Sequence, residues 1–256
     1  MLNAILTGKS GTTIAQDITK GTSWRTLFKK SEDLLTATVF ERLAYLPSRR
    51  FFQIISDTFG LSFEFIAGNT ETIILKTIEF WPRWDDVTDN ALIVEPDVFL
   101  SFYIPETGKT IDMIIEAKPF DTGTLQYKTQ WERQILSYAA MAKELESPVI
   151  RVVYLALGGL GLDPKIRFST LKNEFINTCD DVLYPKNLDF AGCSWSALMD
   201  TCENLNDLTE FVTRIVADIL EALSLSGYSK RLYFNDLILE LSHQELDFAL
   251  EQNNNW

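Results

Sequence analysis

Residues 93–118 read IVEPDVFLSFYIPETGKTIDMIIEAK, and this stretch decides the fold. Residues 92–103 are mostly Ile, Val, Phe, Leu and Tyr, which suit a half-buried strand, and residues 110–117 form a second apolar run. Between the two runs, residues 105–109 form a short cluster that contains Pro and Gly and favours a turn. The pattern therefore predicts an antiparallel hairpin.

Among the charged residues of this hairpin, three are candidates for a joint site. Because side chains alternate between the faces of a strand, Glu116 and Lys118 project to the same side, and Asp97 can face them from the neighbouring strand. Two carboxylates brought together beside a sheet repel one another unless a hard cation with oxygen ligands compensates them. We expect Mg²⁺ in this role, with Mn²⁺ as a substitute. Such a cation activates a water molecule and stabilises phosphodiester displacement, while a lysine orients or activates the nucleophile.

The spacing of these residues resembles a known motif. Glu95-Pro96-Asp97, then eighteen residues, then Glu116-Ala117-Lys118 is similar to the signature of the PD-(D/E)XK phosphodiesterase superfamily, which includes restriction, repair and antiviral-defence nucleases. The resemblance implies that Asp97 and Glu116 are metal ligands and that Lys118 orients or activates the attacking water. The alternative is a solvated strand face on which the three residues have no joint function.

A helix is predicted before the hairpin. Residues 31–47 have apolar residues at helical spacing, with Ser31 as the N-cap and Pro47 as the stop. Glu32 lies in the first turn, where the helix dipole favours an anion. In nucleases that this chain resembles, the first core helix often contributes an acid to the metal site, so Glu32 is a candidate catalytic residue. Glu41 is a second candidate from the same helix.

A second helix is predicted after the hairpin, over residues 129–146. Gln134 and Tyr138 are four residues apart in it and share one helix face. A Q-x-x-x-Y motif directly after the E-x-K strand resembles the exonuclease-like branch of the superfamily. That resemblance implies that Gln134 and Tyr138 bind substrate or support the lysine; for Tyr138, core packing is the alternative.

The remaining chain is assigned by pattern. Residues 148–157 predict a strand buried on both faces that follows a parallel crossover. Together with the resemblance, this predicts an α/β fold, a restriction-endonuclease-like core with a mixed central sheet flanked by helices. Further predicted elements are a helix capped by Ser48 (48–58), strands at 61–67 and 72–81, a polar loop (82–90), and C-terminal helices at 169–178, 194–204, 208–225 and 235–250. The expected organisation is an N-terminal arm (1–27), the nuclease-like core (28–162) and a helical extension packed on it (163–256).

Composition limits the cellular setting and the chemistry. The chain has 256 residues, 46% of them hydrophobic, without a secretory signal or an apolar run of membrane-spanning length, so we expect a cytoplasmic protein. Its three cysteines and single histidine have no zinc-site spacing, so we expect reduced thiols.

The formal charge of −13 argues against simple DNA binding, because phosphate contacts require Lys or Arg. We therefore expect either a basic groove of limited size or a protein partner, including a second copy of the chain, that brings DNA to the site. The function expected is that of a Mg²⁺-dependent deoxyribonuclease in microbial restriction or phage defence. Three alternatives remain open: a catalytically silent nuclease-fold module that binds nucleic acid or a protein partner, an RNA-directed nuclease, and a helical partner-binding protein.

Overall fold

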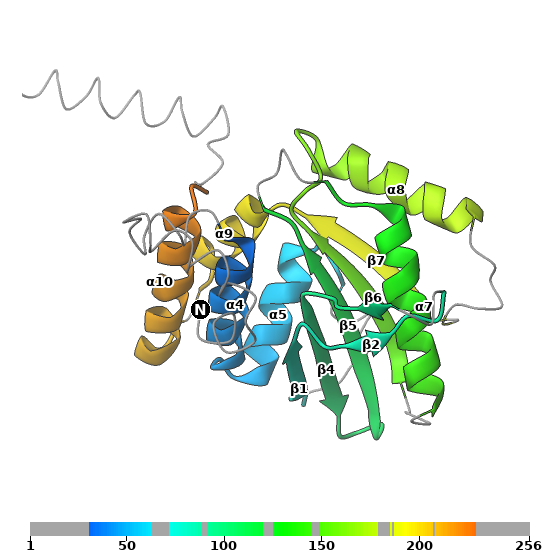
Figure 1. The fold of residues 1–256 in the computed structure, drawn as a ribbon. Coiled ribbons are helices and arrows are strands. Elements are labelled where there is room, and N and C mark those ends of the chain that lie inside the picture. The colour runs from blue at the N-terminus through cyan, green and yellow to red at the C-terminus, as the bar shows by residue number, and fades with distance from the viewer. Residues whose placement is uncertain are drawn as a thin grey trace, which may run out of the picture.

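The computed structural model describes residues 31–62, 72–88, 92–119, 125–144, 149–178, 185, 187–206 and 208–228. Within these residues the protein is an α/β structure with a mixed central sheet of five strands flanked by helices (Figure 1). Three sequence predictions lie outside the described residues: the N-terminal arm (1–27), the last C-terminal helix (235–250) and most of the strand predicted at 61–67.

The predicted hairpin forms the centre of the sheet. Its strands pair antiparallel, Val98 with Ile115 and Ile104 with Lys109, and Gly108 in the turn has a φ of +67°. The strand order is β1-β4-β5-β6-β7; β1, β4 and β5 are antiparallel, while β6 and β7 run parallel to β5, as the predicted crossover requires. The strands are β1 (Ile74–Phe80), β4 (Val98–Ile104), β5 (Lys109–Ala117), β6 (Val149–Leu157) and β7 (Leu188–Cys193).

The first strand of the hairpin starts later than predicted. Residues 93 and 94 form a separate strand, β3 (Ile93–Val94), which pairs with β2 (Trp84–Asp85) in a two-stranded sheet. Pro96 has no amide hydrogen and separates β3 from β4. The prediction of a polar loop at residues 82–90 was therefore partly wrong, because this segment contains β2. Arg133 connects this small sheet to the main fold, donating from Nε to the buried carboxylate of Asp86 at 2.7 Å.

Six helices are described: α4 (Glu32–Ala44), α5 (Ser48–Thr58), α7 (Lys128–Glu144), α8 (Pro164–Thr178), α9 (Trp195–Glu203) and α10 (Glu210–Leu225). The start of α4 is as predicted, because the Ser31 side chain accepts the amide hydrogen of Leu34 at 3.3 Å. The predicted cap of α5 was wrong. Ser48 is the first helical residue, Pro47 occupies the N-cap, and no side-chain cap bond is made.

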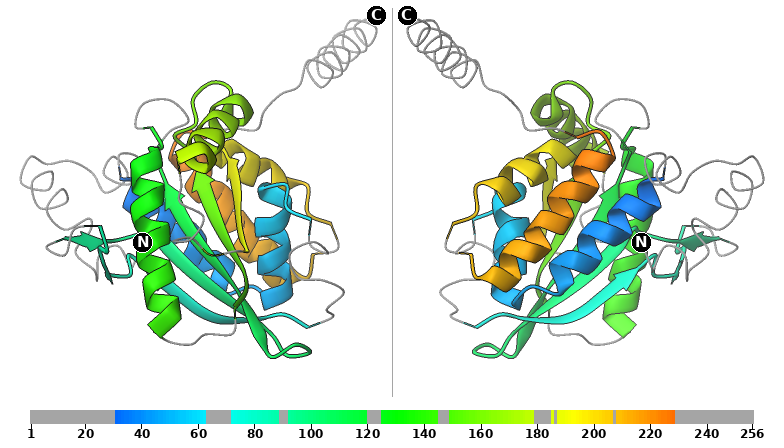
Figure 2. Two further views of the ribbon diagram at one scale, coloured as in Figure 1. Left: turned by 90° about the vertical axis from the view of Figure 1, so that its right-hand side faces the viewer. Right: turned by 90° about the vertical axis from the view of Figure 1, so that its left-hand side faces the viewer.

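The helices form two layers on opposite faces of the sheet, as the two side views show (Figure 2). Alternating strand residues such as Leu100 and Phe102 pack in one core cluster with α4, α5, α9 and α10. Their neighbours, such as Phe99, pack in a second cluster with α7 and α8. The face of β5 that carries Glu116 is therefore the face covered by α7.

The C-terminal region, predicted to be helical, also contributes a strand to the sheet. β7 pairs with β6 along its full length, and α9 and α10 pack against α5 and α4. The sequence of β7, LDFAGC, is short and contains a glycine and an acid, so its pattern did not predict a strand. Gly192 permits close contact with the ring of Phe168, because a Cβ there would lie 2.8 Å from Cγ of that ring.

Two predictions, one on the cysteine thiols and one on membrane-spanning segments, can be compared with the structure only for the described residues. Cys193 and Cys202 are buried free thiols, and Cys179 lies outside the described residues. None of the helices in the described part of the chain is long and apolar enough to cross a bilayer.

Candidate functional site

Asp97 and Glu116 occupy neighbouring positions where the β4–β5 hairpin ends. Val98 pairs with Ile115, so the next position outward on each strand is Asp97 and Glu116. Asp97 accepts the backbone amide hydrogen of Ala117 at 2.8 Å. Burial raises the pKa of Asp97 well above its ordinary value, and the negative charges of Glu116 and Glu32 raise it further, against the opposing effects of Lys118 and the Ala117 bond.

The Glu116 carboxylate is 2% exposed and accepts hydrogen bonds from three side chains. Lys118 forms an ion pair with Oε1, Gln130 donates to Oε1 at 2.6 Å, and Gln134 donates to Oε2 at 2.6 Å. Burial by itself would lower the pKa of Lys118, but the charges of Glu116, Asp97 and Glu32 outweigh it and raise the pKa. The lysine is therefore a cation at neutral pH.

Glu32 lies near the same group of charges. Its negative charge, in the first turn of α4, contributes to the raised pKa values of both Asp97 and Lys118. Glu41 lies nine residues further along α4, about 13 Å along the helix axis, away from this turn.

Helix α7 brings Gln134 to the site but not Tyr138. The hydroxyl of Tyr138 donates to Oδ2 of Asp112 at 2.7 Å, and Ser101 donates to the other oxygen of that carboxylate, also at 2.7 Å. Burial raises the pKa of Tyr138, and the Asp112 charge adds to the rise, so the hydroxyl remains a donor. Of the residues that the sequence singled out, the structure thus brings together Asp97, Glu116, Lys118 and Gln134, and the charge of Glu32 acts on Asp97 and Lys118.

Sequence reasoning missed two glutamines that contact Glu116. Besides Gln130, the fully buried Gln126 donates from Nε2 to the main-chain carbonyl of Glu116 at 3.0 Å and to that of Gly158 at 3.3 Å, and its Oε1 accepts from Trp131 at 3.0 Å. A signal was available in the sequence. Gln130, Gln134 and Tyr138 follow one another at intervals of four residues within the predicted helix, the spacing that aligns side chains along one helix face, and Gln126 precedes the helix at the same interval.

The main chain of Lys118 is held from the other face of the sheet. Trp195, at the start of α9, donates from its indole to the Lys118 carbonyl at 3.0 Å, and the Lys118 amide donates to Leu157 at 2.8 Å. Gly158 has a φ of +69°, and a Cβ there would overlap the Lys118 carbonyl oxygen. The predicted helical extension therefore helps to fix the candidate catalytic strand.

The chemistry of the donors fits a hard divalent cation. Asp97 and Glu116 lie at neighbouring positions, the negative charge of Glu32 acts on Asp97 and Lys118, and carboxylate oxygens are the ligands that Mg²⁺ takes. Within the described residues, no group of three or more His, Cys, Asp or Glu side chains is already arranged around a common point. The oxygens of Glu116 face Lys118 and two amides. Three of its roughly four acceptor positions are used, so one remains.

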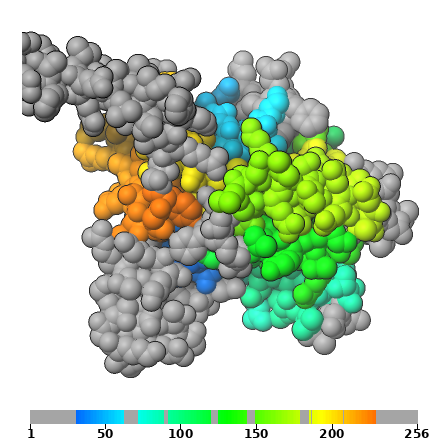
Figure 3. Space-filling view, turned by 90° about the horizontal axis from the view of Figure 1, so that it is seen from above, coloured from blue at the N-terminus to red at the C-terminus, as the bar shows by residue number. Residues whose placement is uncertain are grey.

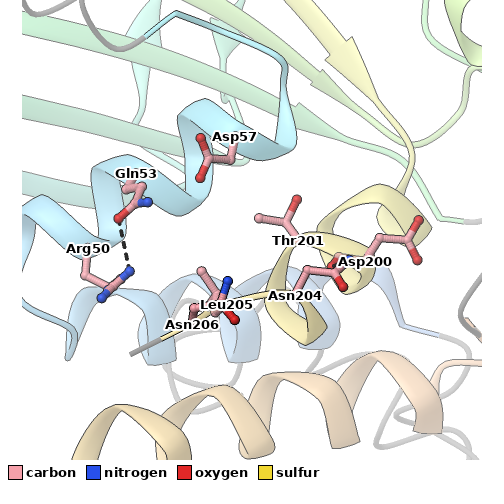
Figure 4. Close-up of a pocket in the computed structure, with 8 residues that line it drawn as sticks. All are labelled: Arg50, Gln53, Asp57, Asp200, Thr201, Asn204, Leu205 and Asn206. Carbon is pink, nitrogen blue, oxygen red and sulfur yellow. Dashed lines mark hydrogen bonds between the residues drawn. The ribbon is translucent and has the colours of Figure 1, made fainter. Parts of the chain in front are cut away.

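Two cavities lie elsewhere. One, of about 520 Å³, lies between parts of α5 and α9 and is lined by polar side chains such as Gln53 and Asn204 (Figure 4). A second, of about 430 Å³, lies at the start of α9 and shares Asp57 with the first. None of the residues that line them belongs to the group around Glu116.

A relative aligns with most of this chain. Uncharacterized protein PM0110 of Pasteurella multocida (strain Pm70) is 34% identical over 216 residues, which cover 81% of this chain and 77% of that protein. The chain belongs to the family of this Pasteurella protein. The relative's name assigns no activity to the family, and neither a family model nor a solved structure matches the chain.

Proposed function

We propose that this protein is a metal-dependent nuclease with a restriction-endonuclease-like core that hydrolyses phosphodiester bonds of DNA. The supporting observation is that Asp97, Glu116 and Lys118 lie together where the β4–β5 hairpin ends, with the negative charge of Glu32 acting on Asp97 and Lys118. The sequence of hairpin, helix α7 and buried parallel strand β6 is in keeping with the superfamily resemblance. A microbial restriction or phage-defence role is part of the proposal.

In this proposal Asp97 and Glu116 hold Mg²⁺, for which Mn²⁺ substitutes. When bound, such a cation supplies Lewis acidity and lowers the pKa of a coordinated water. Lys118, which forms an ion pair with Glu116, orients the attacking water and offsets negative charge that develops on the phosphate.

The remaining residues support these two acids. Gln130 and Gln134 hold the Glu116 carboxylate from the α7 side with neutral donors, which fixes its orientation without cancelling its charge. Glu32 adds a further negative charge that favours a cation beside Asp97.

The distribution of charge suggests where DNA approaches. Basic residues outnumber acids on α8, with Lys165, Arg167 and Lys172 against Glu174. On the opposite layer, α9 and α10 carry Asp200, Glu203, Glu210, Asp218 and Glu221 against Arg214. Helix α8 forms an exposed ridge in the view from above (Figure 3). We propose that DNA approaches over the α7–α8 layer, with a protein partner or second copy supplying further positive charge.

One observation favours a different function. Glu116 is already matched by an ammonium and two amides, an arrangement that is stable without a cation. This would suit a nuclease-fold module that binds nucleic acid or a protein partner but does not cleave.

Cleavage assays separate the two proposals. Purified protein is incubated with supercoiled, linear and single-stranded DNA in Mg²⁺, Mn²⁺ or chelator, with RNA as a parallel substrate. The nuclease proposal expects cleavage of DNA that requires the cation. Binding of DNA without cleavage in any of these conditions would favour the silent module, and cleavage of RNA alone would favour the RNA-directed alternative.

A further inference from the structure

Both the nitrogen and the oxygen of the Gln134 side-chain amide form hydrogen bonds. Its Nε2 donates to Glu116 at 2.6 Å, and its Oε1 accepts from the hydroxyl of Tyr154 at 2.5 Å. Gln134 is 1% exposed and Tyr154 is fully buried, so water does not replace either partner. A primary amide presents an acceptor at one end and donors at the other. The hydroxyl of Tyr154 therefore favours the orientation in which the donor end faces the carboxylate.

Tyr154 is fully buried on the sheet, and its hydroxyl donates a hydrogen bond to Gln134. It lies on β6 opposite Ile114, on the face of the sheet that α7 covers, and its ring packs against Trp131 at 5.3 Å between centroids. Burial raises its pKa well above the ordinary value, and the charges of Glu116 and Asp97 add to the rise. The hydroxyl therefore keeps its proton at neutral pH.

We propose that Tyr154 is a positioning residue for Glu116 that acts through Gln134, an inference that rests on the proposed nuclease function. Without the hydroxyl, Oε1 of Gln134 is left buried and unsatisfied, and the side chain turns away to find a partner. Glu116 then keeps the bonds from Lys118 and Gln130 but loses the one that fixes its second oxygen. Tyr154 never touches the substrate.

A double-mutant cycle tests whether the action runs through Gln134. We expect Tyr154→Phe to lower the kcat for DNA cleavage about tenfold with KM unchanged, and Gln134→Met to lower it at least as much. If Tyr154 acts only through Gln134, the double variant has the same kcat as Gln134→Met. Independent, multiplicative losses in the double variant would overturn the proposal. Urea unfolding of each variant confirms that it folds.

A second readout does not depend on catalysis. In ¹⁵N-labelled protein, we expect the side-chain NH₂ protons of Gln134 to exchange with solvent about tenfold faster in Tyr154→Phe than in the wild type. The matched control is Tyr103→Phe, whose hydroxyl has no hydrogen-bond partner in the described part of the chain and which should leave this exchange unchanged. Unchanged exchange in Tyr154→Phe would overturn the inference. If the wild type cleaves no DNA, the nuclease proposal fails while this measurement still decides whether Tyr154 orients Gln134.

Discussion

Gln126 is the side chain whose removal should weaken the site's framework most. It is fully buried, and its amide joins the ends of β5 and β6 to the indole of Trp131 through three hydrogen bonds. Gln126→Leu keeps a similar volume but leaves two carbonyls and one indole N–H short of a partner. Each buried unsatisfied group costs about 1–3 kcal/mol. Because such losses are not additive, we expect the substitution to lower the free energy of unfolding by about 2–5 kcal/mol.

Urea unfolding measures this loss, which is a large part of the roughly 5–15 kcal/mol that stabilises a typical protein. The midpoint should fall with an unchanged m-value. The control is Gln53→Leu on α5. Among the described residues this half-buried side chain bonds only to Arg50, at 3.1 Å, so we expect a change within about 0.5 kcal/mol. A Gln126→Leu protein as stable as this control would refute the reasoning that the three bonds hold the strand ends.

Three further results are expected. Gly158→Ala should destabilise the protein by about 2–4 kcal/mol in urea unfolding, because the new methyl overlaps the Lys118 carbonyl. The control Gly108→Ala has a similar φ but nothing within 4 Å of the new methyl, so it should cost only about 1–2 kcal/mol. Equal losses in the two variants would argue against the overlap. Adding Mn²⁺ at about 100 times its Kd should stabilise the wild type by about 2.7 kcal/mol in thermal unfolding and Asp97→Asn much less; equal stabilisation would remove Asp97 from the metal site. Tyr138→Phe should lower the free energy of unfolding by about 1–3 kcal/mol, since its carboxylate partner on β5 loses a buried donor, and no loss would contradict the described bond.

The parts of the fold that sequence predicted are those set by local pattern. The hairpin follows from two apolar runs around a turn, and α4 follows from helical spacing behind Ser31. β7 could not be predicted in this way, because LDFAGC becomes a strand only by pairing with β6. The separation of β3 from β4 likewise depends on a pairing with β2 that the local pattern does not reveal.

In the candidate site, too, sequence predicted the features set by local pattern and missed those set by contacts between distant residues. Asp97, Glu116 and Lys118 could be placed together because strand alternation and hairpin register fix their positions. The spacing of Gln134 and Tyr138 also placed them on one helix face, but it could not show that the two side chains reach different acids of β5. The contact of Trp195 with Lys118 could not be predicted from sequence, since it joins residues 77 positions apart.

The most direct test of the account compares DNA cleavage by the wild type, Asp97→Asn and Lys118→Met under identical conditions. The account predicts that the wild type cleaves DNA in Mg²⁺ and not in chelator. Each variant should be slower by a factor of about 10²–10⁴ while unfolding at a urea concentration close to that of the wild type. Cleavage at equal rates by all three proteins, or the absence of metal-dependent cleavage by the wild type, would contradict it.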